Sequence, residues 1–282
     1  MPPAPSPRLY CIPATAAPVV AVIRRGPSAW TQIGRWDLER GTYDAGAWAR
    51  ARVYPERCDL SPDGRWLAYF TLRGAARPDW PAGSTYIALS RLPWLKALAA
   101  WSTCGTWTRG VHFVDDRRVW ELGEPDVGDA APCRERYGMR VSAPLAFAAE
   151  HRRGWRESDG SPPREQRGHW DEKIDGLVME KPRPGDGDVV LHAHGYYAAF
   201  RAMLPSDTLD FGYELRIDDT QHELPDVQWA DWDARGRLLV ATTDGRLQIR
   251  AGSPRALTVE WETDLAPLAP DPQPPPRDAS RW

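Results

Sequence analysis

Asparagine is absent from the 282-residue sequence, and lysine accounts for only three of its 36 lysine and arginine residues. Without asparagine, no N-glycosylation acceptor can form. Tight turns must instead use Asp-Gly pairs, such as Asp63-Gly64, Asp186-Gly187 and Asp244-Gly245. The strong preference for arginine over lysine is typical of a GC-rich genome, and we therefore expect a bacterial protein.

Long apolar runs are also missing. No segment approaches the roughly 18 to 20 apolar residues that a membrane helix needs. Residues 1–7 are interrupted by prolines and lack the basic stretch of a secretory signal. The net charge of -3 provides no strong field toward nucleic acid or anionic lipid. We therefore expect a cytoplasmic protein without a membrane partner, and nucleic acid is disfavoured as a ligand.

Motifs that carry catalysis are not found either. The sequence contains no G-x-S-x-G elbow, no H-E-x-x-H helix and no glycine-rich phosphate loop. The cysteines are widely spread, without zinc-finger spacing, and are expected to be buried reduced thiols, with a disulfide as the alternative. These cysteines are Cys11, Cys58, Cys104 and Cys133. The sequence therefore favours a protein that is not an enzyme and needs no cofactor.

What the sequence does contain is a turn followed by a short apolar run, present twice in nearly the same form. Residues 61–70 read SPDGRWLAYF, and residues 233–241 read DARGRLLVA and align with them without a gap. Each is the pattern of a β-hairpin. Weaker copies lie at 113–120 and 185–191. A hairpin that recurs about every 50 residues predicts a strand-rich repeat.

Several further elements are predicted around these turns. Residues 93–101 begin with proline and carry tryptophan and leucine at helical spacing, which predicts a short helix, with an irregular outer strand as the alternative. Alternating and β-branched residues predict strands elsewhere. The predicted strands are 18–23, 65–71, 85–89, 227–232, 237–242, 247–249 and 257–261.

Residues 61–69, SPDGRWLAY, resemble the S-P-D-G-[KR]-x-[IL]-[AV] signature of WD40-like and TolB-type β-propeller repeats. The resemblance implies an all-β fold, a β-propeller of about five four-stranded antiparallel blades, with six or seven blades as alternatives. The competing interpretation is a set of unrelated hairpins in a β-sandwich or an α+β fold. The Trp-Asp pairs of true WD repeats are not at the matching places, so no functional residue is carried over.

One domain is expected over residues 8–265, with a flexible insertion near 134–168 and a proline-rich tail over 266–282. Acidic residues within the insertion neutralise more than half of its arginines, so it is interpreted as a solvated loop rather than a nucleic-acid site. The tail is prone to polyproline structure and is expected to be solvated, with docking to a proline-binding partner as the alternative.

Arginine and tryptophan occur together near the ends of predicted strands. These residue types are enriched at binding hot spots, and strand ends of a propeller converge on its two flat faces. We therefore expect a surface for a protein partner, and the alternative is arginine stacked on tryptophan between blades. The residues are Arg24, Arg25, Trp30, Arg35, Trp36, Arg91, Trp94 and Trp107.

The pair His192 and His194 would project two imidazoles from one face of a strand, because strand side chains alternate with period two. This spacing could hold one divalent metal if a third histidine and a carboxylate completed it. The competing interpretation is two polar residues on a solvated sheet face. The residues expected to complete the site are His169 or His222 with Asp186 or Asp188.

Taken together, these patterns predict a non-enzymatic propeller scaffold that binds protein partners. The first alternative is a propeller hydrolase of the glycosidase or lactonase type, using carboxylates or a histidine-bound metal. The second is a carbohydrate-binding lectin whose tryptophan rings stack on sugars. The 15 tryptophans also suit a structural role between packed sheets, which we expect for most of them.

Overall fold

The computed structural model describes residues 6–27, 29–74, 79–103, 105–107, 110–141, 148–158, 173–198, 211–218 and 220–282. Over these residues the protein is all-β, with antiparallel sheets of four, six, five and four strands, a two-stranded ribbon and a few short helices. The chain divides into two compact units. Unit 1 comprises residues 1–5, 10–149 and 268–282, and unit 2 comprises residues 6–9 and 150–267.

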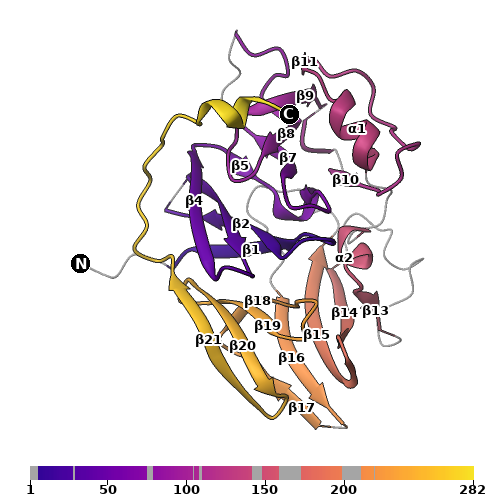
Figure 1. Ribbon diagram of the computed structural model, residues 1–282, viewed down its shortest axis with the longest axis vertical. Helices are drawn as coiled ribbons and strands as arrows, with labels where there is room; N and C mark the ends of the chain where they lie inside the picture. Colours follow the sequence, from indigo (N-terminus) through magenta and orange to yellow (C-terminus); the bar gives the residue numbers. More distant parts are fainter. Residues whose placement is uncertain are drawn as a thin grey trace. The chain divides into compact units, whose positions relative to one another are not determined.

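The first sheet is a four-stranded meander in the order β1-β2-β3-β4 (Figure 1). β2 confirms the strand predicted from the apolar run at 18–23. The turn after β3 passes through Gly41 at a φ of 61°, and the Asp37 carboxylate accepts the backbone N–H groups of Glu39 and Arg40. The strands are β1 (Arg8–Pro13), β2 (Val19–Arg25), β3 (Thr31–Asp37) and β4 (Thr42–Ala49).

The second sheet has the order β11-β9-β8-β7-β5, and the short β6 also pairs with β7. The strands predicted at 65–71 and 85–89 are confirmed as β7 and β8. The sheet lies in unit 1, with the 3-10 helices η1 (Pro55–Arg57) and η2 (Gly105–Trp107) nearby in the chain. Its strands are β5 (Arg52–Val53), β6 (Asp59–Leu60), β7 (Trp66–Leu72), β8 (Thr85–Arg91), β9 (Ala97–Ser102) and β11 (Val127–Gly128).

The helix predicted at 93–101 is wrong, because residues 93–96 form no regular element and residues 97–101 belong to β9, in agreement with the alternative of a strand. Ala100 packs in one buried cluster, whereas its neighbours Ala99 and Trp101 pack in another on the opposite face. Successive side chains that face opposite cores require the period of a strand. Leu98 and Trp101 nevertheless pack against the same cluster, because the register shifts between the pairs Leu89–Ala99 and Ser90–Ala97 and Leu98 lies in that irregularity. This bulge gives the two residues their helical spacing.

The hairpin predicted at 113–120 is also wrong. β10 (Val111–Phe113) pairs with β12 (Met139–Val141), which follows helix α1 (Ala131–Tyr137). Asp115 has a φ of 58°, which turns the chain away after β10. The side chain of Arg118 is 91% exposed and Trp120 is 49% exposed, so the residues directly after this turn do not form a buried strand.

Unit 2 contains a five-stranded sheet in the order β13-β14-β15-β16-β17. The hairpin predicted around 185–191 is confirmed, but its turn lies at Pro184 and Gly185 rather than at the expected Asp186-Gly187, where β15 already begins. The predicted insertion contains β12, helix α2 (Ala148–Arg152) and β13; its residues 142–147 and 159–168 lie outside the described residues. The strands are β13 (Arg156–Glu157), β14 (Lys173–Arg183), β15 (Asp186–Ala198), β16 (Phe211–Ile217) and β17 (Thr220–Glu223).

The last sheet, also in unit 2, is a meander in the order β18-β19-β20-β21, which confirms the four strands predicted for this region (Figure 1). The N-terminal residues 6–9 belong to the same unit. The Leu9 N–H donates to the Gln228 side chain at 3.0 Å, and that side chain donates back to the Pro7 carbonyl at 3.3 Å. The strands are β18 (Val227–Trp232), β19 (Leu238–Thr242), β20 (Arg246–Ser253) and β21 (Ala256–Asp264).

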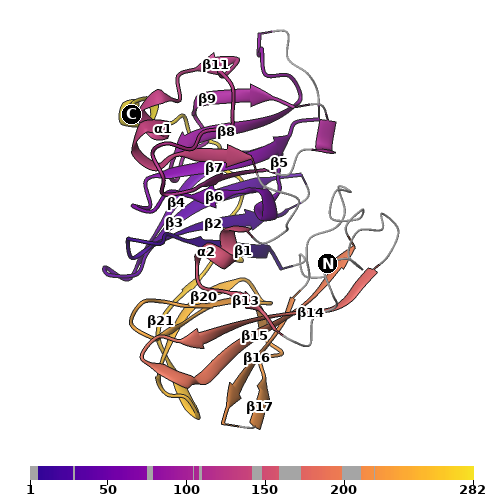
Figure 2. The ribbon, with the colours of Figure 1, turned by 90° about the vertical axis from the view of Figure 1, so that its right-hand side faces the viewer.

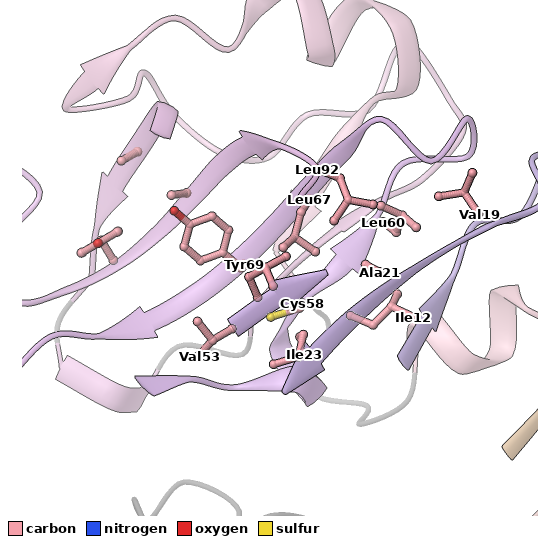
Figure 3. Close-up of a cluster of buried hydrophobic side chains, with 14 of the residues drawn as sticks. Ile12, Val19, Ala21, Ile23, Val53, Cys58, Leu60, Leu67, Tyr69 and Leu92 are labelled. Atoms are coloured by element: carbon pink, nitrogen blue, oxygen red, sulfur yellow. The ribbon is translucent and has the colours of Figure 1, made fainter. Parts of the chain in front are cut away.

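The second sheet is buried on both faces, which makes unit 1 a stack of sheets (Figure 2). On one face it packs against the first sheet, and on the other against the β10–β12 ribbon and α1. Trp66 and Trp101 take part in this packing, and the other buried tryptophans among the described residues are Trp36, Trp48, Trp155, Trp229 and Trp232, which supports a structural role for these rings. The first contact joins Ile12, Val19, Ala21 and Ile23 to Val53, Leu60, Leu67 and Tyr69 (Figure 3). The second joins Trp66, Phe70 and Trp101 to Phe113, Tyr137 and Met139.

Two smaller observations complete the fold. Cys11, Cys58 and Cys133 are buried thiols, in agreement with the interpretation from sequence, whereas Cys104 lies outside the described residues. Burial raises the pKa of the Cys133 thiol to about 12. Among the residues that the structure describes, no helix has the length and apolar character needed to cross a membrane.

Candidate functional site

Four side chains of unit 1 form a series of cation–aromatic contacts, here called the Arg–Trp stack. The Arg24 guanidinium carbon lies 5.1 Å from the centroid of the Trp48 ring. That ring meets Trp30 edge to face, with centroids 6.4 Å apart. The guanidinium carbon of Arg50 lies 5.9 Å from the Trp30 centroid. The stack therefore links the ends of β2 and β4 through the loop before β3.

The inner end of the stack is fixed by burial. Arg24 is 2% exposed, and its guanidinium donates to the carbonyls of Gly26 at 2.5 Å and Leu268 at 2.9 Å. Desolvation by burial lowers the pKa of Arg24. At the outer end, Trp30 is half-buried and Arg50 is exposed. The outer pair, Trp30 and Arg50, is therefore connected through the Trp48 ring to the buried and hydrogen-bonded side chain of Arg24.

The remaining residues predicted to bind a partner do not join the stack. Arg25 is half-buried at the end of β2, and Trp94 is half-buried after β8. Arg35 forms ion pairs with Asp37 and Asp44 on the first sheet. Trp36 is fully buried, so its ring is not at the surface. The last two are Arg91, at the end of β8, and Trp107, in η2.

The structure also shows what Arg91 contacts, which is the C-terminal tail. Its guanidinium donates to the Asp278 carbonyl at 3.2 Å, within η5 (Arg277–Ser280). Beyond it, the Trp282 ring lies 5.1 Å from Trp66, and Ala279 is buried. The tail, drawn in yellow in Figure 1, is therefore attached to unit 1 near both of its ends. Its middle, residues 271–278, is exposed, as expected for a solvated segment.

A second group of polar side chains lies on one face of the five-stranded sheet. Alternation along β15 and β16 places Leu191 and Leu215 on the buried face and His192 and Glu214 on the other. On this second face four residues lie directly opposite one another across β14, β15, β16 and β17. The row is Glu180, His192, Glu214 and Glu223.

Within this row, one carboxylate oxygen connects two imidazoles. Glu214 Oε1 lies 3.2 Å from His192 Nδ1 and 3.0 Å from His194 Nε2. The Gln221 amide donates to the same oxygen at 3.1 Å. The side chains of His192 and Glu214 are 10% and 13% exposed, and that of His194 is 45% exposed. The ligand atoms of the three residues all lie within 4.8 Å of one another, so they could hold a metal ion.

The structure therefore brings the two predicted histidines together with a carboxylate that was not predicted. His222 pairs with Leu215 and lies on the opposite face of the sheet. Asp188 precedes His192 by four residues, about 13 Å along a strand, and Asp186 is farther still. His169 lies outside the described residues. Glu214 was missed because it becomes a neighbour only when β15 and β16 pair.

Comparisons with known proteins place the chain in no family. No protein-family model and no curated protein matches it. Among solved structures, the β-propeller domain of the Trilobed protease from Pyrococcus furiosus is 11% identical with a TM-score of 0.28, covering 90% of this chain and 72% of that one. The uncharacterized protein lmo1340 from Listeria monocytogenes EGD-e is 8% identical with a TM-score of 0.26. That match covers 91% of this chain and 54% of the Listeria protein, so this chain spans about half of that protein's length. At TM-scores this low, neither likeness carries an argument about this chain.

Proposed function

We propose that this protein is a non-enzymatic scaffold that binds a protein partner through the outer end of the Arg–Trp stack. The observation that supports this is the contact of Arg50 with the Trp30 ring. That ring packs against Trp48, which in turn contacts the buried Arg24. Arginine and tryptophan dominate binding hot spots. Side chains that are already ordered lose less conformational entropy when a partner docks. A partner that presents a carboxylate beside an apolar group would suit this pair.

The proposal includes a propeller-like arrangement of about five blades. Four of the sheets follow one another along the chain as antiparallel meanders of about four strands. Such units pack face to face in a propeller, and the second sheet packs against the first sheet in this way. Its other face packs against the β10–β12 ribbon and α1. The broad ends of the stacked sheets would provide the docking surface.

The test is to capture partners from the organism that encodes the chain and to compare two double variants. Trp30→Ala with Arg50→Ala removes the outer end of the stack while leaving its buried part in place. The matched control is Arg118→Ala with Trp120→Ala, an exposed arginine and tryptophan elsewhere in unit 1. We expect a discrete, stoichiometric partner to be lost from the first double variant by at least about tenfold, or 1.4 kcal/mol.

The same partner should be retained by the control. A partner retained equally by both double variants, or lost equally from both, would contradict the assignment of this surface. Turnover of a small molecule by the purified chain, with no stoichiometric partner, would overturn the scaffold function itself.

A further inference from the structure

We propose that His192, His194 and Glu214 form a binding site for one divalent transition-metal ion, with Zn²⁺ the best match. Two imidazoles and one carboxylate are a ligand set that proteins use for this ion. Over the residues that the structure describes, this is the one set of three such side chains whose ligand atoms converge. The site is independent of the Arg–Trp stack and of the protein-binding function proposed for it.

The spacing of the ligand atoms suits tetrahedral coordination. With zinc-to-ligand bonds of about 2.0–2.2 Å, the tetrahedral angle separates neighbouring ligand atoms by about 3.3–3.6 Å. The distances from Glu214 Oε1 are 3.2 Å to His192 Nδ1 and 3.0 Å to His194 Nε2. These atoms therefore need only small side-chain rotations to surround an ion, and the 45% exposed side chain of His194 is less restricted by packing than that of His192, which is 10% exposed.

Outer hydrogen bonds orient the same ligands. Gln221 donates to Glu214 Oε1, which restrains the carboxylate. If His192 binds through Nδ1, its Nε2–H faces Glu180, whose Oε2 lies 3.9 Å away. Metal-binding histidines usually donate their second N–H to a carboxylate or carbonyl, which fixes the ring and strengthens it as a ligand. Within the described residues, His192 Nε2 is buried and makes no hydrogen bond, so its N–H is available to donate to Glu180.

Three protein ligands leave one tetrahedral position open. Zinc sites in which water or a further ligand takes the fourth position are distinct from the closed sites of purely structural zinc. The 45% exposed side chain of His194 places the open position toward solvent. A water molecule or a donor group of another molecule could therefore occupy it.

A hydrogen-bonded His–Glu–His network is the competing account of this cluster. In that case, the imidazole N–H groups would satisfy Glu214 and no ion would be needed. The two accounts therefore differ in whether the full chain takes up an ion at all.

The experiment uses the full chain, treated with a chelator, dialysed and titrated with ZnCl₂ by calorimetry. A parallel titration with CoCl₂ reads the visible ligand-field spectrum, which is intense for tetrahedral cobalt. We expect one ion per chain. Removing an outer hydrogen bond through Gln221→Ala should weaken affinity by roughly 10- to 100-fold. His194→Ala and Glu214→Gln should each weaken it more and abolish the tetrahedral cobalt spectrum.

His222→Ala is the matched control, because it removes an exposed histidine from the opposite face of the same sheet. Its affinity and cobalt spectrum should equal those of the wild type. His194 is exposed, so its substitution should preserve the fold, which circular dichroism checks. The proposal is overturned if the wild type takes up no stoichiometric ion, or if His194→Ala and His222→Ala weaken binding to the same extent.

Discussion

The two aligned turns, residues 61–66 in unit 1 and 233–238 in unit 2, are built alike but are joined to their strands differently. Gly64 and Gly236 have φ values of 71° and 73°, and each donates its N–H to the carbonyl three residues earlier, at 2.8 and 3.0 Å. The strand pairing around them differs. Leu60 pairs with Leu67, whereas Trp232 pairs with Leu238, so the second connection is one residue shorter.

That single residue reverses the direction of one side chain. Asp59 and Asp231 both lie two residues before their turn, and both are buried. Asp59 lies opposite Ala68 and accepts the N–H of Phe113 at 2.9 Å. Asp231 lies opposite Leu239. In the alignment of the two repeated sequences, Leu239 corresponds to Leu67, not to Ala68. A shift of one residue in register moves side chains to the other face of a sheet.

The consequence is that equivalent aspartates connect to neighbouring sheets by different chemistry. Both aspartates accept the backbone N–H of the next residue, Leu60 or Trp232, and Asp59 also accepts the backbone N–H of Phe113. Asp231 accepts a hydrogen bond from the Lys181 ammonium of β14 at 2.5 Å. Similar repeat sequences thus allow different connections, because the register of the strand decides which neighbour each carboxylate meets.

Breaking the charged connection should have the largest effect on stability. Lys181→Met would leave the Asp231 carboxylate, whose side chain is 3% exposed, buried without its cation. Removing one partner of a buried ion pair costs about 3–5 kcal/mol. We expect the free energy of unfolding of unit 2, measured by urea denaturation, to fall by this amount.

The double variant Lys181→Met with Asp231→Leu should recover most of that loss, because no unpaired charge remains. A loss below about 1 kcal/mol in the single variant would mean that the pair behaves like an exposed one. The different connections of Asp59 and Asp231 would then make no difference to the free energy of unfolding.

Substituting the two turn glycines should have an intermediate effect. A non-glycine residue in this left-handed region costs about 1–2 kcal/mol. A Cβ on Gly64 would also lie 2.7 Å from the Val19 Cβ, and one on Gly236 would lie 2.9 Å from the Pro184 carbonyl oxygen. We therefore expect Gly64→Ala and Gly236→Ala each to lower the free energy of unfolding by about 2 kcal/mol.

Gly187→Ala provides the control, since a Cβ there would meet nothing within 4 Å. It should change stability by less than about 1 kcal/mol. If the Gly187 variant were as destabilised as the other two, the backbone conformation of the turns could not be the cause.

The smallest effect concerns a third turn of the same kind, residues 242–246. The hydroxyl of Thr242 donates to Asp244, and this hydrogen bond lowers the pKa of the Asp244 carboxyl. A carboxylate with a lowered pKa stabilises the fold above its ordinary pKa of about 3.9, and the stabilisation is lost as the pH falls through the lower value of the folded state. Thr242→Val should therefore reduce the melting temperature more at pH 6 than at the lowest pH at which the chain still folds.

Asp244→Asn tests the cause, because an amide does not titrate. Its melting temperature should lack the acid-dependent step that distinguishes the wild type from Thr242→Val. An identical pH profile for Asp244→Asn and the wild type would assign the step to another carboxylate.

Local sequence predicted the turns and the strands beside them because their signals lie within a few residues. The glycine at positive φ, the polar residue three positions earlier and the apolar run are adjacent in both 61–70 and 233–241. The four strands after residue 227 were predictable for the same reason. The segment 93–101 was not, because an irregularity at Leu98 in β9 gave Leu98 and Trp101 a helical spacing within a strand.

The candidate sites could be predicted only in part, because their remaining members come from other strands. Period two along β15 was enough to place His192 and His194 on one face. Glu214 reaches them through the pairing of β15 with β16, whose register depends on burial of the leucines on the opposite face. In the same way, Arg24 and Trp30 were identified, but Trp48 and Arg50 arrive from β4 and the residue after it.

The attachment of residues 268–282 to unit 1 has a consequence for how the protein is made. A ribosome releases these residues only after every strand of unit 1, and all of unit 2, has been synthesised. Until then Trp66 lacks its contact with Trp282, and Arg24 lacks the carbonyl of Leu268. Unit 1 therefore cannot complete its packing before unit 2 has been synthesised, and its last step of folding must follow the synthesis of the tail.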